Sequence, residues 1–594
     1  MIEGRLFSRD PKSGLKRLSG SVLLDPKSPT ELPLFCLQQR YPQIVVQLEG
    51  LVAAREREHG GAVQCRFQVV DEQAVLTEVE DLKCSVEAKL RILKDLVEEG
   101  SLTCGQALER LEPFDLRQCP QISKRDVHRL KNEGRLTAEG SGNGLGIAAG
   151  YLAFDAESAW KIHARNKPVL LVTQRLDLGS KDALEVCQGV LSSEPAPWFR
   201  EKPLLVIPAL DNLQPDRDYI LDSTHHKLWR GCVEPEMAPG ETALAPIRSW
   251  LRSVGGLDVR CNLSSVDEAE SLAGSDVHSV GLCRAELFFQ SSPQRLEVLR
   301  EALNGAIAGE KSGTDAMAAV IAADVERLLK ALSPHRDAVL TLRFFDAPLS
   351  RMLTLWTRYL GVTREQLHDF LWGLLEERNS TQGLRGGRFS LLFPAFFEAQ
   401  VRGAGLALKR TGEKGRLQLM LPGVSTVEEV RFFHRRADSV FRSLELEPPC
   451  FGMMLETPRA CLLADRFVED CDFFSFGTGD LTESVFALSR YDAPLSFLAE
   501  FLDASGLSED PFKRLDSTGV GELMALACQK IRAHRDDVEI GWCGTQAVHG
   551  VPNDLWERLN LDYVSVPLSS VEATRLSAFQ SSLGLHAPSE NTNP

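Results

Sequence analysis

The stretch CFGMMLETPRACLLADRFVEDCDFFSFGTGD, residues 450–480, contains two short apolar runs joined by a longer segment. Apolar runs that alternate with longer helical stretches are typical of a parallel sheet covered by helices. The eight apolar runs of this kind are LDVRCNLS (257–264), SVGLCRAE (279–286), AVLTLRFFD (338–346), GRFSLLFP (387–394), LQLMLPG (417–423), CFGMMLETP (450–458), DFFSFGTGD (472–480) and VEIGWCG (538–544). Eight such units predict an α/β fold with a C-terminal (β/α)8 TIM barrel over residues 245–585, whose chemistry gathers at the C-terminal ends of the strands.

The region before the barrel divides into shorter patterns. Residues 1–80 mix turn signals with alternating apolar runs, which predict the strands of a mixed α+β region. Apolar residues at helical spacing between Ser85 and Leu111 predict a helical hairpin within residues 81–140. The polar, Gly-rich residues 120–145 predict a linker. Strand-like runs over residues 141–240 predict a small strand-rich domain.

The composition indicates which binding partners and which cellular compartment to expect. The 83 acidic against 67 basic residues give a net charge of -16, which argues against binding to nucleic acid or anionic membranes. The first residues, MIEGRLFSRDPKSG, lack the apolar core of a signal peptide, and no apolar stretch approaches the length of a membrane span. The 14 cysteines include no C-x-x-C pair, so neither a zinc knuckle nor a disulfide framework is indicated. We therefore expect a cytoplasmic protein.

Polar side chains follow or precede the apolar runs at one predicted end of the barrel. They are Arg284, Arg343, Arg385, Glu456, Asp480 and Cys543. Converging arginines and carboxylates suit a small, multiply anionic ligand bound together with a hard divalent cation. The alternative is a set of salt bridges at the rim of the barrel. The coincidence of six such residues on one face favours the binding site.

Six motifs around these residues resemble pyruvate, phosphate dikinase. They are GLCRAELFF (281–289), LRFFDAPL (342–349), GLRGGRF (383–389), MLETPRACLLAD (454–465), FFSFGTGDLTESVFALSRYD (473–492) and WCG (542–544). The wider group includes phosphoenolpyruvate synthase and enzyme I of the sugar phosphotransferase system. Its members share a (β/α)8 barrel that binds phosphoenolpyruvate or pyruvate with magnesium.

The resemblance implies a role for each matching residue. Arg284 and Arg343 would hold the phosphoryl group, and Glu456 and Asp480 would bind Mg²⁺. The backbone of Gly477, Thr478, Gly479 and Asp480 would receive the substrate carboxylate, and Arg385 and Arg490 would lie near the substrate. Cys543 would protonate the enolate that remains when phosphoenolpyruvate loses its phosphoryl group. The alternative for Cys543 is a buried structural cysteine.

The chain also departs from the family's pattern. Residues 141–236 resemble both ends of the family's swivelling phosphohistidine domain, but no histidine lies between His163 and His225, so the phosphate carrier is missing. His225 and His226 fall in a predicted hairpin turn and are expected to be surface residues.

Two further departures concern nucleotide and phosphoryl binding. Residues 1–80 resemble a truncated ATP-grasp remnant in which Arg66 replaces a magnesium-binding glutamate and Val79 replaces an arginine, so ATP binding is not expected. Gly479 replaces an asparagine whose amide would bind the phosphoryl group, which weakens the expectation of phosphoenolpyruvate affinity.

These observations predict a dikinase-like protein that binds phosphoenolpyruvate, pyruvate or a related 2-oxo acid with Mg²⁺ and performs enolate or phosphoryl-transfer chemistry. It would not be an autonomous ATP-dependent dikinase. The resemblance also allows a homodimer formed through the barrel and a separate phosphohistidine or ATP-grasp protein as partner. The rival hypothesis is a non-catalytic pseudoenzyme that acts as a metabolite sensor or scaffold.

Overall fold

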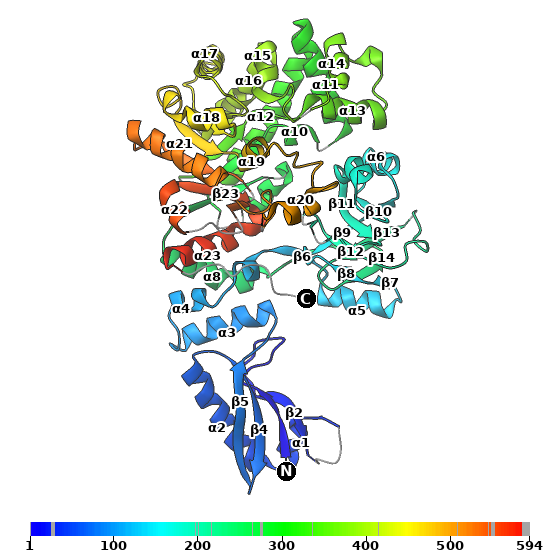
Figure 1. Ribbon diagram of the computed structural model, residues 1–594, viewed down its shortest axis with the longest axis vertical. Helices are drawn as coiled ribbons and strands as arrows, with labels where there is room; N and C mark the ends of the chain where they lie inside the picture. Colours follow the sequence, from blue (N-terminus) through cyan, green and yellow to red (C-terminus); the bar gives the residue numbers. More distant parts are fainter. Residues whose placement is uncertain are drawn as a thin grey trace. The chain divides into compact units, whose positions relative to one another are not determined.

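The computed structural model describes residues 2–584 except 25–29, 197, 200, 216, 264, 274–276, 291, 336, 380, 414, 508, 545 and 548–552. The chain divides into two compact units (Figure 1). The first contains residues 1–118, 239–256 and 575–594, and the second contains residues 119–238 and 257–574. Across the described residues, every helix is too short or too polar to cross a membrane.

An antiparallel sheet opens the first unit. Its strands are β1 (Ile2–Phe7), β2 (Ser19–Leu23), β3 (Leu32–Pro33), β4 (Val63–Val70) and β5 (Gln73–Asp81), in the order β3-β2-β1-β4-β5. Helices α1 (Leu34–Arg40) and α2 (Pro42–His59) accompany the sheet, and α2 runs alongside it in Figure 1. Leu6, Phe67 and Leu48 are buried in the core that they share. Arg66 lies on the exposed side of β4, where it pairs with Glu78 at 3.1 Å.

The predicted helical hairpin is confirmed. It consists of α3 (Val86–Glu98) and α4 (Cys104–Glu109). The Ser85 hydroxyl accepts a hydrogen bond from the backbone of Ala88 and so caps α3, while Thr103 and Gln106 form a capping box on α4. Helix α8 (Glu241–Ser253) packs against α3 and α4 within the same unit.

The small domain, residues 119–238 of the second unit, is built on one mixed sheet. Its strands are β7 (Leu136–Glu139), β8 (Ser141–Gly142), β9 (Ile147–Ala153), β10 (Val169–Thr173), β11 (Cys187–Ser192), β12 (Leu204–Val206), β13 (Asp218–Asp222) and β14 (Lys227–Arg230), in the order β7-β14-β13-β9-β10-β11-β12-β8. Its helices are α5 (Lys124–Asn132), α6 (Ala156–His163) and α7 (Lys181–Leu184). A separate pair joins β6 (Cys119–Gln121) to β15 (Glu236–Ala238).

Two expectations about the small domain can now be compared with the structure. The linker predicted over residues 120–145 is wrong, because α5, β7 and β8 form there. The polar composition misled the prediction, since only Leu130 of α5 is buried and the rest of that helix is exposed or half-buried. His225 and His226 do lie in the turn between β13 and β14, where Asp222 contacts the His225 ring and Gly142 donates its N–H to His226 Nδ1.

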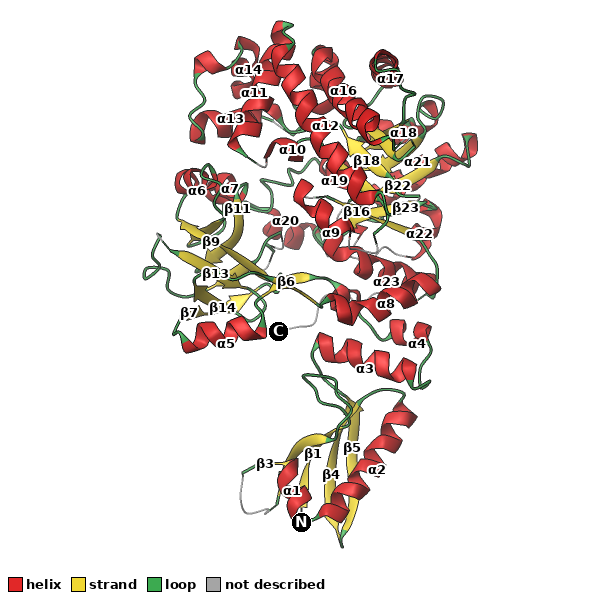
Figure 2. Cartoon of the chain, turned by 180° about the vertical axis from the view of Figure 1, so that it is seen from behind, coloured by secondary structure: helices red, strands yellow, loops and turns green. Residues whose placement is uncertain are grey.

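The barrel, residues 257–574, confirms the predicted fold class. Its eight parallel strands close in sequence order: β16 (Asp258–Asn262), β17 (Val280–Arg284), β18 (Leu340–Arg343), β19 (Leu417–Leu421), β20 (Cys450–Leu455), β21 (Phe473–Phe476), β22 (Glu539–Trp542) and β23 (Tyr563–Pro567). Every residue of β18 and β21 is buried, as expected for strands covered by helices on the outside and side chains within. Figure 2 shows these strands in yellow among the red helices.

The covering helices are unequal in length. The longer ones are α11 (Pro293–Ala308), α12 (Ser312–Leu332), α13 (Leu349–Tyr359), α16 (Pro394–Thr411), α17 (Val427–Ser443), α21 (Val520–His534) and α23 (Val571–Ser582). The shorter ones are α9 (Ala269–Ala273), α10 (Leu287–Gln290), α14 (Asp369–Gly373), α15 (Gly386–Leu392), α18 (Pro458–Leu462), α19 (Thr478–Phe486), α20 (Leu498–Ser505) and α22 (Asn553–Leu559).

One predicted barrel strand is wrong and another strand was missed. GRFSLLFP (387–394) forms helix α15 and the start of α16, whereas the eighth strand is β23. A short apolar run does not distinguish a strand from a buried helix turn, so periodicity alone could not decide. As a result, Glu456 follows the fifth barrel strand, Asp480 the sixth and Cys543 the seventh.

Candidate functional site

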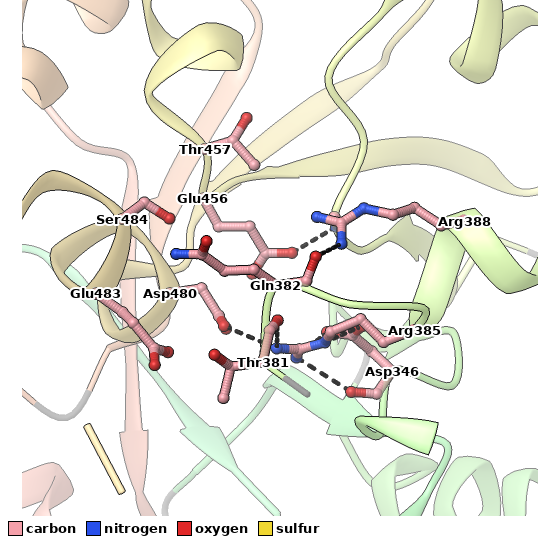
Figure 3. Close-up of a pocket in the computed structure, with 11 residues that line it drawn as sticks. Asp346, Thr381, Gln382, Arg385, Arg388, Glu456, Thr457, Asp480, Glu483 and Ser484 are labelled. Atoms are coloured by element: carbon pink, nitrogen blue, oxygen red, sulfur yellow. Dashed lines mark hydrogen bonds and ion pairs between the residues drawn. The ribbon is translucent and has the colours of Figure 1, made fainter. Parts of the chain in front are cut away.

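The candidate site lies where three barrel strands end. Arg343 closes β18, Glu456 directly follows β20, and Gly477 to Asp480 follow β21. Parallel strands place their carboxyl ends on one face of the barrel, so residues distant in sequence meet there. Figure 3 shows Arg385 between Asp346 and Asp480 on this face.

A small cavity of about 50 Å³ opens between these strand ends. It is lined by Asp346, Thr381, Gln382, Arg385, Arg388, Gly423, Glu456, Thr457, Asp480, Glu483 and Ser484. Three of the predicted site residues therefore line it: Arg385, Glu456 and Asp480. The other predicted residues lie outside this lining; they are Arg284, Arg343, Gly477, Thr478, Gly479, Arg490 and Cys543. The cavity suits a metal ion or a few small groups rather than a bulky ligand.

A chain of ion pairs connects most of the predicted arginines. Asp346 accepts two hydrogen bonds from Arg385, at 2.8 Å from Nε and 2.6 Å from Nη2, and lies 3.4 Å from Arg343 Nη1. Arg385 also reaches Asp480 Oδ1 at 3.0 Å. Arg490 donates to the same oxygen of Asp480. Bidentate arginine contacts of this kind hold a carboxylate in a fixed orientation.

Glu456 differs from Asp480 in having no arginine bound to it. Its side chain is 3% exposed, and Oε1 accepts a hydrogen bond from the N–H of Gly423. Its other oxygen, Oε2, has no hydrogen-bond partner among the described residues. Burial raises the pKa of Glu456, and the negative charges of Asp480 and Asp346 raise it further.

Asp480 has the opposite electrostatic environment. Burial alone would raise the pKa of Asp480, but Arg490 and Arg385 outweigh that effect and hold it well below its usual range. Both arginines bind Oδ1 of Asp480. The site thus contains one firmly ionised carboxylate beside one whose ionised form is disfavoured, although the charges of Arg343 and Arg385 partly oppose that effect.

The donor set of Glu456 and Asp480 fits Mg²⁺. The buried, unpartnered Oε2 of Glu456 is the kind of atom that a cation would satisfy. The described residues contain no group of three or more His, Cys, Asp or Glu side chains that could enclose a metal. Mg²⁺ does not require such a cage, because it commonly binds one or two carboxylates and completes its coordination with water and substrate oxygens.

The start of α19 is closely packed against Glu456 and Arg490. A side chain at Gly477 would place its Cβ 2.6 Å from Glu456 Oε2, and a side chain at Gly479 would place its Cβ 2.4 Å from Arg490 Nη1. The Arg490 guanidinium thus occupies space that any larger residue at position 479 would need. The N–H groups of the first helical turn lack partners within the helix, so the backbone here is suited to an anion. Thr478 has a structural role, since its hydroxyl accepts a hydrogen bond from Trp542 Nε1 at 2.9 Å.

Cys543 lies directly after β22 and is 5% exposed. Its Sγ is 3.3 Å from the carbonyl oxygen of Phe476, and it packs in a small apolar cluster with Leu282, Met420, Met454 and Phe473. Burial raises the pKa of the Cys543 thiol, while the charges of Arg284 and Arg343 oppose the increase. The sulfur is therefore held as a thiol within the electrostatic field of the site.

The remaining predicted arginines at the strand ends, Arg343 and Arg284, differ in whether a carboxylate of the described chain binds them. Arg343 is buried and pairs with Glu286 as well as with Asp346. Arg284, the last residue of β17, is exposed, and within the described chain it forms no ion pair with a carboxylate. Arg284 is thus the more available of the two for an incoming anion.

Among the residues of the site that were not predicted from the sequence are three carboxylates that contact arginines. Asp346 and Glu286 each hold a predicted arginine, and Glu483 approaches Arg490 Nε at 3.4 Å. Asp346 and Glu286 lie just after β18 and β17, so the strand-end argument that found Arg343 and Arg284 also applies to them. Glu483, one turn into α19, has no such signal.

Comparisons with known proteins identify the family of the chain. Residues 240–583, more than half of the chain, match the family described as PEP-utilising enzyme, PEP-binding domain. The chain is 28% identical over 638 residues to the chloroplastic pyruvate, phosphate dikinase of Mesembryanthemum crystallinum, covering 97% of this chain and 65% of that protein. It is 26% identical over 639 residues to the pyruvate, phosphate dikinase of Clostridium symbiosum, covering 98% and 71%.

The chain thus spans about two thirds of the length of these relatives. Among solved structures, Haloferax volcanii malate synthase aligns at 10% identity with a TM-score of 0.31, covering 57% of this chain and 75% of that one. The family match and the strand-end site together place the protein: the chain belongs to the PEP-utilising enzymes and contains their PEP-binding domain.

Proposed function

We propose that the barrel binds phosphoenolpyruvate, pyruvate or a related 2-oxo acid together with Mg²⁺ and uses this site for enolate or phosphoryl-transfer chemistry. The observation that carries the proposal is the pair Glu456 and Asp480. One is buried with an unpartnered oxygen, and the other is held ionised by two arginines, with a small cavity beside them. Such a pair suits a divalent cation and a small anion bound side by side.

Glu456 and Asp480 would hold the metal. Bound Mg²⁺ would supply positive charge that stabilises an enolate oxygen. The backbone N–H groups of the first turn of α19 would receive the substrate carboxylate. Arg284, which is exposed and not paired with a carboxylate of the described chain, would bind the phosphoryl group from the side of β17, with Arg343 beside it.

Cys543 is proposed as the acid at the methylene carbon of the enolate. In that step the S–H bond breaks, a C–H bond forms at the methylene carbon, and the electron pair of the S–H bond remains on sulfur as a thiolate. Arg284 and Arg343 favour the thiolate, because their charges lower the pKa of Cys543. Burial raises the pKa of the Cys543 thiol, which keeps the thiol protonated near neutral pH before this step.

The phosphoryl carrier is proposed to be a separate protein. The small domain has no histidine between His163 and His225, and the turn that holds His225 and His226 is a hairpin rather than the start of a helix. Arg66 is engaged by Glu78 on an exposed strand face, an arrangement that offers no ligand to a magnesium-nucleotide complex. We therefore do not expect the chain to act as an ATP-dependent dikinase by itself.

A non-catalytic role as sensor or scaffold is the second candidate. It is favoured by one observation, namely that Arg343, Arg385 and Arg490 are all bound to carboxylates within the site. An anion that enters must compete with these internal pairs. Binding without turnover would satisfy this arrangement equally well, so catalysis has to be tested directly.

The test is exchange of the methyl protons of pyruvate for deuterium, followed by proton NMR with Mg²⁺ and with phosphate present and absent. We expect the wild-type protein to exchange these protons faster than buffer and Cys543→Ala to lose the exchange. Cys543→Ser should also lose it, because a hydroxyl is far less acidic than a thiol. Cys528→Ala, at another buried cysteine on α21, is the matched control and should exchange normally.

The outcomes separate the two candidates. Equal exchange by wild type and Cys543→Ala would show that Cys543 is not the acid. Absence of exchange in the wild type under every condition would overturn the catalytic proposal and favour the sensor or scaffold.

A further inference from the structure

The small domain is fastened to the barrel through helix α13. Asp182, on α7, accepts a hydrogen bond from the Tyr359 hydroxyl at 2.7 Å. Trp160 stacks on the ring of Tyr359, with centroids 5.7 Å apart and planes 4° apart. Arg351 pairs with Glu185 at 2.7 Å. Stacking, hydrogen bonding and ion pairing therefore act at the same contact.

A second contact joins the same domain to the segment that follows α19, residues 487–497. Lys181, the first residue of α7, forms an ion pair with Asp492 Oδ1. Leu495 packs against the apolar core of the small domain, which contains Val169, Val190 and Phe199. One charged and one apolar contact thus hold this segment from the side of the small domain.

The same segment carries Arg490. The Ser489 hydroxyl donates a hydrogen bond to Asp492 Oδ2 at 3.2 Å and accepts one from the N–H of Asp492 at 3.2 Å. The Asp492 carboxylate therefore closes the turn around Arg490 with one oxygen and receives Lys181 with the other. Within this turn, Arg490 binds Asp480.

We infer that Lys181 is a positioning residue for the anion site, acting through Asp492 on the segment that presents Arg490 to Asp480. In this role the small domain, which lacks a phosphate-carrying histidine, holds the segment of the barrel that carries Arg490. The inference rests on the proposed function, because Asp480 is one of the two residues proposed to hold Mg²⁺. The inference extends that function, because the small domain would position Arg490 at a site to which the domain itself contributes no ligand.

The test compares charge reversal with rescue in the full chain. Lys181→Glu places a negative charge opposite Asp492, and the double variant Lys181→Glu/Asp492→Lys restores the pair with the charges exchanged. Lys227→Glu is the matched control, because Lys227 forms a partly exposed pair with Glu139 inside the small domain. Lys181→Met replaces Lys181→Glu if the reversal does not fold. The readouts are the Kd of oxalate with Mg²⁺ by calorimetry and hydrogen–deuterium exchange of residues 487–497.

We expect Lys181→Glu to weaken oxalate binding about twofold to fivefold, the scale of one partly exposed ion pair, and to speed exchange of residues 487–497. The double variant should recover both properties in part, because Asp492→Lys restores the ion pair but removes the carboxylate that accepts the Ser489 hydroxyl. Lys227→Glu should change neither property. Unchanged exchange in Lys181→Glu, or faster exchange with unchanged oxalate affinity, would overturn the inference. If the wild type does not bind oxalate, the proposed function fails. In that case faster exchange in Lys181→Glu, with partial recovery in the double variant, would support only the role of Lys181 in holding this segment, and unchanged exchange would overturn it.

Discussion

The ends of β20 and β21 bring two carboxylates to one cavity, where the two differ in their bonding partners and in the direction of their pKa shifts. Asp480, after β21, shares one oxygen with Arg385 and Arg490, which lower its pKa. Glu456, after β20, has only the N–H of Gly423 on one oxygen and no partner among the described residues on the other. The comparison shows that Glu456 is the carboxylate whose ionised form is the less stabilised of the two in the metal-free protein. A cation bound beside Glu456 would supply the missing stabilisation.

The largest expected effect is a difference in the sign of two stability changes. Asp480→Asn leaves Arg385 and Arg490 without their shared carboxylate, so the free energy of unfolding should fall by about 3 kcal/mol. Glu456→Gln removes a carboxyl group whose ionised form burial disfavours, and it should raise the free energy of unfolding by about 1 kcal/mol in metal-free protein at pH 8. Chemical denaturation of both variants in the presence of a chelator measures the two changes. Equal destabilisation by the two variants would show that Asp480 and Glu456 do not differ in this way.

The next effect is a pH dependence of stability to which the raised pKa of Glu456 contributes. Because its folded-state pKa is raised, the folded protein binds a proton that the unfolded chain has already lost. Stability without metal should therefore fall as pH rises from the unfolded pKa toward the raised one, by at most about 1.4 kcal/mol per pH unit. Added Mg²⁺ should stabilise more at pH 8 than at pH 6, because it competes with that proton.

Thermal unfolding at both pH values, with Mg²⁺ and with chelator, checks this dependence. Glu456→Gln is the control and should show no difference in the Mg²⁺ effect between the two pH values. Asp480 contributes the opposite slope, since its lowered pKa gives stability that is lost only as pH falls through the acidic range. A Mg²⁺ effect that is the same at pH 6 and pH 8 in the wild type would contradict the assignment.

The smallest effect concerns Gly479 and tests how much the contact of Arg490 with Asp480 contributes to binding. Gly479→Asn would drive the Arg490 guanidinium away, since a Cβ there lies 2.4 Å from Nη1. The side chain that moves is flexible, so we expect little loss of stability but about fivefold weaker oxalate binding, the value of one ion pair. Gly479→Ala should have the same effect. Stronger binding by Gly479→Asn alone would show that an amide at this position compensates for Arg490.

Much of this arrangement could be predicted from the sequence, because strand ends in a barrel share one face. That argument found Arg343, Glu456 and Asp480, and it would also have found Asp346, which follows the same strand as Arg343. The pairing of Asp480 with both Arg385 and Arg490 could not be predicted, since it depends on how two loops fold over the cavity. GRFSLLFP was misassigned because apolar side chains bury equally well in a strand and in a short helix.

The small domain shows a similar limit. Most of its strands were predicted from apolar runs, but β7 and β8 were not. Helix α5 was also missed, because eight of its nine residues are exposed or half-buried. Its contact with the barrel through Lys181 and Asp492 joins residues more than 300 positions apart, and no local pattern indicates such a pair.

The central claim is that Glu456 and Asp480 together create a Mg²⁺-dependent site for a small dianion that resembles the pyruvate enolate. Isothermal titration of oxalate into the full chain, with Mg²⁺ and with chelator, tests it most directly. We predict binding to the wild type only with Mg²⁺, and at least hundredfold weaker binding to Glu456→Gln and to Asp480→Asn, since either change leaves the metal with a single carboxylate. Oxalate binding that is equal with and without Mg²⁺, or unchanged in both variants, would contradict the account.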